Sequence, residues 1–132
     1  MRAVMGGLAL AALATAAAAE TSLASLRWRS RVLVISAPAS GDPALRAQRD
    51  ALGAHRGGLT ERDLVVLEVV GDSAEARHLR AELGLPPGAS RAVLVGKDGG
   101  AKLTSDEPIP PQKLFATIDA MPMRRDEMRG RH

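Results

Sequence analysis

Three short runs of apolar residues, largely β-branched, constrain the fold of this chain most strongly. They cover residues 32–35 (VLVI), 64–70 (LVVLEVV) and 92–95 (AVLV), and turn-forming residues bound each run. Continuous apolar runs of this length are typical of strands that are buried on both faces of a sheet. The sequence therefore predicts three core strands within a layered α/β domain.

The two segments between these runs carry apolar residues at helical spacing, with capping residues at their ends. Both predict crossover helices. The first helix is expected to start at Asp42, with Pro43 in its first turn, and to end near Gly57 and Gly58; the second is expected to start at Asp72 or Ser73 and to end at Gly84.

The region after the third run predicts a hairpin and one more helix. Residues 97–100 (KDGG) favour a tight turn, because Asp-Gly tolerates positive φ, and a short edge strand is expected to end near Leu103. Pro110 and Pro111 then open the last helix, which is expected to end at Pro122.

The N-terminal segment has the pattern of a secretory signal peptide. One Arg precedes an uncharged, Ala-rich run, and small residues stand at Ala17 and Ala19. A retained membrane anchor is the alternative, but a spanning helix needs about 20 strongly apolar residues. We expect a signal over residues 1–19, cleavage after Ala19, a periplasmic or secreted mature chain and no transmembrane anchor in it.

The charge of the chain is concentrated at its C-terminal end. The formal charge is +3, but residues 20–123 hold 13 basic and 13 acidic residues, and residues 124–132 hold four arginines. A neutral body argues against nucleic acid as the partner. We expect a domain over 20–123 and a basic tail over 124–132. Its residues Arg124, Arg125 and Arg129 would contact an unknown protein or an anionic envelope component, unless the tail is simply solvated.

Four stretches together resemble a known family: RVLVISAP, LTERDLVVLEVVGD, VLVGKDGGAKL and IDAMPMRRDEM. The chain is similar to an uncharacterised family of small exported thioredoxin-like domains, with relatives in animal extracellular-matrix proteins that include sushi-repeat-containing ones. The resemblance implies an α/β, thioredoxin-like, three-layer sandwich with the order βαβ-α-ββα. It also implies a peroxiredoxin-like variant of that fold with no settled activity.

In such a fold the junction of the first strand and first helix holds the reactive thiol. Here the junction holds Ser36, Ser40 and Asp42, with Arg91 expected beside it from the third strand. One interpretation is a site for a carboxylate or phosphate, because a helix N-terminus and an arginine both favour anions. The other is structural: Asp42 caps the helix and pairs with Arg91.

The absence of cysteine excludes thiol-disulfide exchange and cysteine-dependent peroxide reduction. His55, His78 and His132 are placed neither as a base for a serine nor at metal-ligand spacing, so neither a metal nor another cofactor is expected. Glu68 is expected to lean into solvent from an edge strand, with a functional acid as the alternative.

These observations predict an exported, cysteine-free module that binds or supports other molecules without catalysis. Two alternatives stay open. One is a non-thiol enzyme or small-anion-binding protein that uses the corner at Arg91. The other is an adhesion or scaffold protein of the envelope that works through the basic tail.

Overall fold

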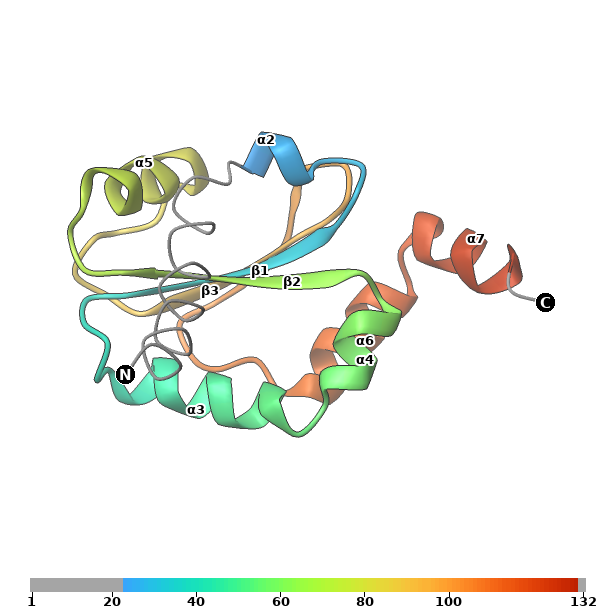
Figure 1. Cartoon of the computed structure of the whole chain (residues 1–132), viewed down its shortest axis with the longest axis horizontal. Helices are drawn as coiled ribbons and strands as arrows, with labels where there is room; N and C mark the ends of the chain where they lie inside the picture. The colour runs from blue at the N-terminus through green and yellow to red at the C-terminus, as the bar shows by residue number, and fades with distance from the viewer. Residues whose placement is uncertain (1–22, 131–132) are drawn as a thin grey trace, which may run out of the picture.

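A computed structural model describes residues 23–130, which form a mixed four-stranded sheet with the order β2-β1-β3-β4 (Figure 1). The strands are β1 (Arg31–Ala37), β2 (Leu64–Val70), β3 (Arg91–Val95) and β4 (Ala101–Ser105). β1 pairs in parallel with β2 and antiparallel with β3, and β4 is antiparallel to β3. The three predicted strands and the hairpin are confirmed. The segment expected to be the signal, 1–19, lies outside the described residues.

One face of the sheet is covered by α2 (Leu23–Leu26) and α5 (Ala74–Leu83), which lie above it in Figure 1. Val32 and Val34 of β1 and Val93 of β3 pack on this side against residues of α5. Ser73 is the N-cap of α5, and its Oγ accepts a hydrogen bond from Ala76 N–H at 3.1 Å. This helix needs Gly84 at its end, where φ is +69°.

The opposite face is covered by α3 (Pro43–Gly53), α4 (Arg56–Glu61) and α6 (Pro111–Asp119), below the sheet in Figure 1. Leu33 and Ile35 point to this side, because successive residues of a strand face opposite ways. β1 is therefore buried along its whole length and contributes to both cores.

The first crossover helix ends earlier than predicted, since Gly57 and Gly58 lie inside the separate helix α4. Close packing explains this position for Gly58. A Cβ at Gly58 would lie 2.7 Å from Cζ of the Phe115 ring, which is closer than carbon atoms approach. Gly58 therefore allows α4 to contact α6, and the two glycines do not terminate α3.

The C-terminal region also differs from the prediction. α6 ends at Asp119, and Pro122 begins a further helix, α7 (Pro122–Gly130), where it occupies the first turn. Most of the segment expected to be a tail is therefore helical. Within residues 23–130, no helix is both long enough and apolar enough to cross a bilayer.

Candidate functional site

Ser36 lies at the C-terminal end of β1, directly opposite Arg91 of β3, as the sequence predicted. The serine is fully buried. Its Oγ accepts a hydrogen bond of 2.8 Å from Nε of Arg80, a buried residue of α5. Because this hydroxyl is enclosed and already bonded, it is inaccessible to a substrate in this structure.

Asp42 caps α3, as one of the two interpretations predicted. Its carboxylate accepts hydrogen bonds from Ser90 Oγ at 2.6 Å and from Leu45 N–H at 3.1 Å. The Ser90 hydrogen bond, followed by that of Leu45, lowers the pKa of Asp42 below its ordinary value. Ser40 is exposed in the loop that precedes this cap.

Arg91 does not pair with Asp42, so that part of the prediction is wrong. Arg91 Nε lies 2.6 Å from Oδ1 of Asp106. The antiparallel register explains the choice, because Ala92 faces Ser105 and Asp106 therefore follows opposite Arg91. The cavity beside Arg91 measures about 10 Å³, which is room for about one water molecule.

Arg80 belongs to this corner and was missed by the sequence analysis. Besides Ser36, its guanidinium donates to the carbonyl oxygens of Ala37 and Val69, at 3.1 and 3.3 Å. It thereby joins the C-terminal ends of β1 and β2 to α5. The available signal was its spacing, since Arg80 stands four residues after Ala76 on the apolar face of the helix.

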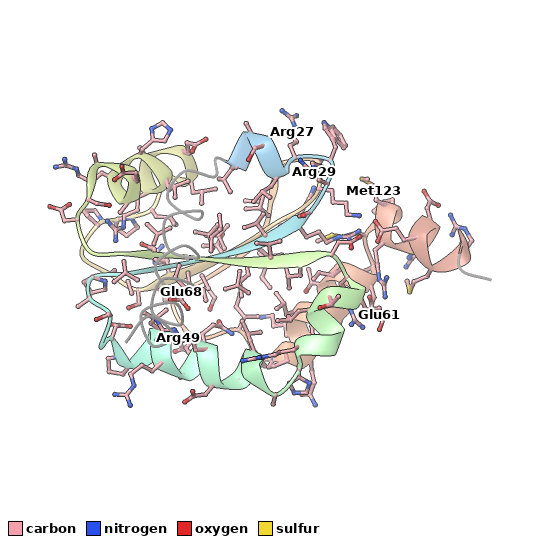
Figure 2. The ribbon with its side chains drawn as sticks, viewed as in Figure 1. Arg27, Arg29, Arg49, Glu61, Glu68 and Met123 are labelled. Atoms are coloured by element: carbon pink, nitrogen blue, oxygen red, sulfur yellow. The ribbon has the colours of Figure 1, made fainter. Side chains whose placement is uncertain are left out.

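Glu68 lies on the edge strand β2, as predicted, but it contacts α3. Arg49 Nε and Nη2 donate to its two carboxylate oxygens at 2.8 and 2.6 Å, and Figure 2 shows the two side chains together below the sheet. The hydrogen bonds and charge of Glu68 raise the pKa of Arg49. A two-point ion pair of this kind connects helix to sheet and explains Glu68 without a catalytic role.

The two histidines within the described residues lie beside side chains of the fold. His55 is the N-cap of α4, and its ring meets the edge of Phe115 with centroids 6.0 Å apart. His78 is exposed on α5, with Nε2 3.5 Å from a Glu82 oxygen. No group of three potential metal ligands occurs within residues 23–130. His132 lies outside the described residues.

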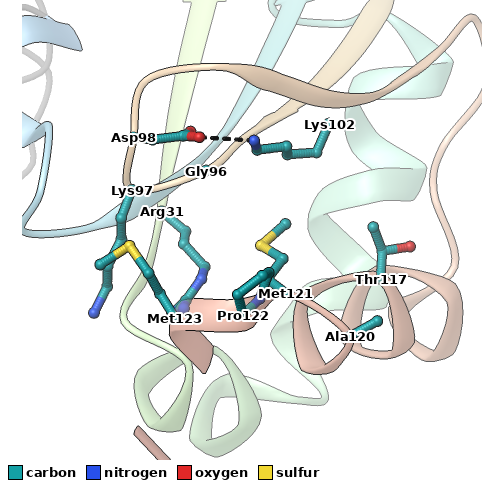
Figure 3. A pocket seen from close by; sticks show the side chains of 10 residues that line it. All are labelled: Arg31, Gly96, Lys97, Asp98, Lys102, Thr117, Ala120, Met121, Pro122 and Met123. Carbon is teal, nitrogen blue, oxygen red and sulfur yellow. Dashed lines mark hydrogen bonds and ion pairs between the residues drawn. The ribbon is translucent and has the colours of Figure 1, made fainter. Parts of the chain in front are cut away.

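A larger pocket lies at the opposite end of the sheet, where the sequence analysis placed no site (Figure 3). Its volume is about 410 Å³, within the range of small-molecule sites. The lining comes from β1, the β3–β4 turn, β4 and the junction of α6 with α7: Arg31, Gly96, Lys97, Asp98, Lys102, Thr117, Ala120, Met121, Pro122 and Met123. Only tertiary packing brings these segments together.

The charges around this pocket neutralise one another. Arg31, with a side chain only 1% exposed, donates to both carboxylate oxygens of Glu127 at 3.1 and 3.0 Å. Lys97 Nζ lies 2.7 Å from Glu127 and 2.9 Å from Asp63. Lys102 pairs in the same way with Asp98 at 2.9 Å.

Glu127 is the central acid of this network. Burial raises its pKa, but hydrogen bonds from Arg31 and Lys97, together with their charges, outweigh burial. The pKa of Glu127 therefore lies below its ordinary value. Glu127 stays ionised at neutral pH and holds α7 against β1.

The three arginines expected to contact a partner differ in burial and in ion pairing. Arg124 is buried, and its guanidinium lies 2.7 Å from Glu61 and 3.0 Å from Asp119, so it attaches α7 to α4 and α6. Arg124 is therefore not available for the partner contact that the sequence predicted. Arg129 pairs with Asp126 on the surface of α7, and Arg125 is exposed.

Comparison with solved structures identifies the class of fold. The chain is similar to the solution structure of desulfothioredoxin from Desulfovibrio vulgaris Hildenborough in its reduced form, with a TM-score of 0.51 and 19% identity. The match covers 77% of this chain and 91% of that one. The protein therefore has a thioredoxin-like α/β fold, and it carries no cysteine.

The family follows from a match over residues 22–127 to the model described as domain of unknown function DUF4174, and the chain belongs to this family. It is also 31% identical to the sushi repeat-containing protein SRPX of Rattus norvegicus over 114 residues, which are 76% of this chain and 25% of that protein. It is 29% identical to coiled-coil domain-containing protein 80 of Danio rerio over 136 residues, 83% of this chain and 16% of that protein. The chain thus spans a quarter or less of these relatives.

Proposed function

We propose that this chain is an exported, non-catalytic binding module of the cell envelope. The observation that carries the proposal is that the polar side chains at the junction of β1 and α3 are already paired within the protein. Ser36 accepts a hydrogen bond from Arg80, Asp42 accepts one from Ser90, and Arg91 forms an ion pair with Asp106. With no cysteine in the chain, this corner has neither a thiolate nor a free volume for substrate.

The larger pocket supports binding at the other end of the molecule. A concave site with apolar walls and a few polar groups is the usual form of a binding site. The pocket at Met121 and Met123 has this form, and it is distant in the fold from the β1–α3 loop. Export is supported by the signal-like pattern of residues 1–19.

The proposal is tested in two parts. N-terminal sequencing of the protein from native cells should find Glu20 first in the fraction outside the cytoplasm, and Ala17→Arg/Ala19→Arg should block this cleavage. The purified mature chain should reduce insulin disulfides and consume peroxide no faster than buffer alone. An intact chain from Met1 in the cytoplasm would refute export, and turnover in either assay would refute the non-catalytic role.

A further inference from the structure

The turn between α2 and β1 presents an aromatic side chain at an unusual backbone position. Trp28 is 60% exposed, and its φ is +68°. A positive φ is rare for residues with a Cβ, and for a bulky side chain it is a true outlier that costs stability. A mostly exposed side chain recovers little of that cost by burial. Folding alone therefore does not explain a tryptophan at this position.

Hydrogen bonds hold the turn in this conformation. Trp28 N–H donates to Lys97 C=O at 2.5 Å, and the N–H groups of Arg29 and Ser30 both donate to Leu26 C=O. The Arg27 guanidinium lies 5.5 Å from the centre of the indole. The ring is thus presented on a rigid backbone, which lowers the entropy that a partner must remove on binding.

The same turn carries positive charge without a compensating acid. Arg27 and Arg29 are exposed, and within residues 23–130 neither forms an ion pair with a carboxylate. By contrast, Lys97 and its neighbours at the pocket are neutralised by Asp63, Asp98 and Glu127. The local excess charge therefore belongs to the two arginines. It favours an acidic partner.

The pocket adjoins this turn through the β3–β4 hairpin. Lys97 accepts the Trp28 hydrogen bond with its carbonyl oxygen and lines the pocket with its side chain. Met123, 39% exposed, stands at the pocket, and Figure 2 shows it at the same end of the molecule as Arg27 and Arg29. Methionine adapts its shape to different apolar groups.

We propose that the Arg27–Arg29 turn and the pocket at Met123 form one docking surface for an acidic peptide segment that carries a large apolar side chain. Its carboxylates pair with the two arginines, its backbone crosses Trp28, and its apolar side chain enters the 410 Å³ pocket (Figure 3). A flat anionic membrane would match the arginines and the indole but would leave a concave pocket empty. This inference rests on the proposed binding function and names the class of partner.

The test selects random 12-residue peptides displayed on phage against the intact mature chain, and measures the enriched peptides by fluorescence anisotropy. We expect enrichment of peptides that combine Asp or Glu with one large apolar residue. Trp28→Gly, Arg27→Glu/Arg29→Glu and Met123→Glu should each raise Kd about tenfold or more. The matched control Arg46→Glu/Arg77→Glu makes the same change of charge on α3 and α5, outside the proposed surface, and should alter Kd less than about twofold.

Folding is checked for each variant by circular dichroism. Trp28→Gly is the variant least prone to unfold, because glycine accepts a positive φ. The inference is overturned if no peptide is enriched, if enriched peptides lack acidic residues, or if Trp28→Gly leaves Kd unchanged. It is also overturned in favour of a membrane if vesicles of 70% phosphatidylcholine and 30% phosphatidylglycerol bind the chain and compete with the peptide. Self-association of the chain that depends on Trp28 would also overturn the inference, in favour of a second copy of the chain as the partner. None of these outcomes bears on export or on the absence of thiol turnover, and those two properties test the proposed function separately.

Discussion

At the scale of single residues, Trp28 separates the requirements of folding from those of binding. Its backbone adopts a conformation that glycine reaches without strain, yet the position holds the only tryptophan of the chain. Strained positions of this kind concentrate at functional sites. Trp28 is therefore the residue at which the stability of the fold and its use as a binding surface conflict.

A pair of substitutions at this position isolates the strain. Trp28→Gly and Trp28→Ala both remove the indole, but only glycine relieves the positive φ. Urea unfolding should therefore find the glycine variant more stable than the alanine variant by about 1 kcal/mol. Equal stability of the two variants would show that the backbone at residue 28 is unstrained.

At the scale of secondary-structure elements, α7 is attached to the domain mainly by ion pairs. Arg124 connects it to α4 and α6, while Glu127 connects it to Arg31 of β1 and to Lys97. Both arginines are buried, so each depends on its acidic partners for compensation of its charge. A helix held in this way is sensitive to pH.

Glu127→Gln measures this dependence. The variant should be less stable than the native chain by about 2 kcal/mol at pH 7, because buried Arg31 loses a charged partner. The folded-state pKa of Glu127 is lowered, so its contribution is complete above its unfolded pKa and is lost as pH falls through the folded pKa. The difference between the two proteins should therefore disappear in strongly acidic solution.

Urea denaturation at a series of pH values from 7 to about 2.5 checks this result. The control is Glu107→Gln, which removes an exposed carboxylate that has no ion pair within residues 23–130. It should have little effect at any pH. A difference for Glu127→Gln that is constant with pH would contradict the role of its charge.

At the scale of the whole molecule, β1 contributes side chains to both hydrophobic cores. Leu33 and Val34 are adjacent and fully buried, but they face opposite helical layers. Damage to either core therefore acts on the strand that supports the other. A domain of this size is expected to unfold in one step.

Alanine substitutions on β1 test whether the two cores unfold together. Leu33→Ala should lower the free energy of unfolding by about 3 kcal/mol and Val34→Ala by about 2 kcal/mol, since each leaves a cavity in a closed core. Each variant should keep a single transition. Circular dichroism in urea gives the stability, and hydrogen exchange of α5 and α6 should report the same loss on both faces of the sheet. Selective loss of protection on one face would show that the two layers unfold independently.

Much of the thioredoxin-like fold was predictable because its signals are local. A buried strand such as Leu64–Val70 is visible as an apolar run, and the helix caps Asp42 and Ser73 act on N–H groups three residues away. Helix α7 was not predictable in the same way. Its charged sequence resembles a solvated tail, and only the fold shows that Glu61, Asp119 and Arg31 form ion pairs with its residues.

Residue patterns alone established the α/β class, the order of elements along the chain and the exclusion of thiol chemistry, since these follow from periodicity and from the absence of cysteine. Tertiary structure decided which acid accepts Arg91, that Arg124 is buried, and where the pocket lies. These outcomes depend on contacts between segments distant in the chain, such as the register that sets Asp106 opposite Arg91 and the packing that brings Met123 beside Lys97. Local spacing carries no information about such contacts, because their free energy arises only when the sheet and its helices are assembled.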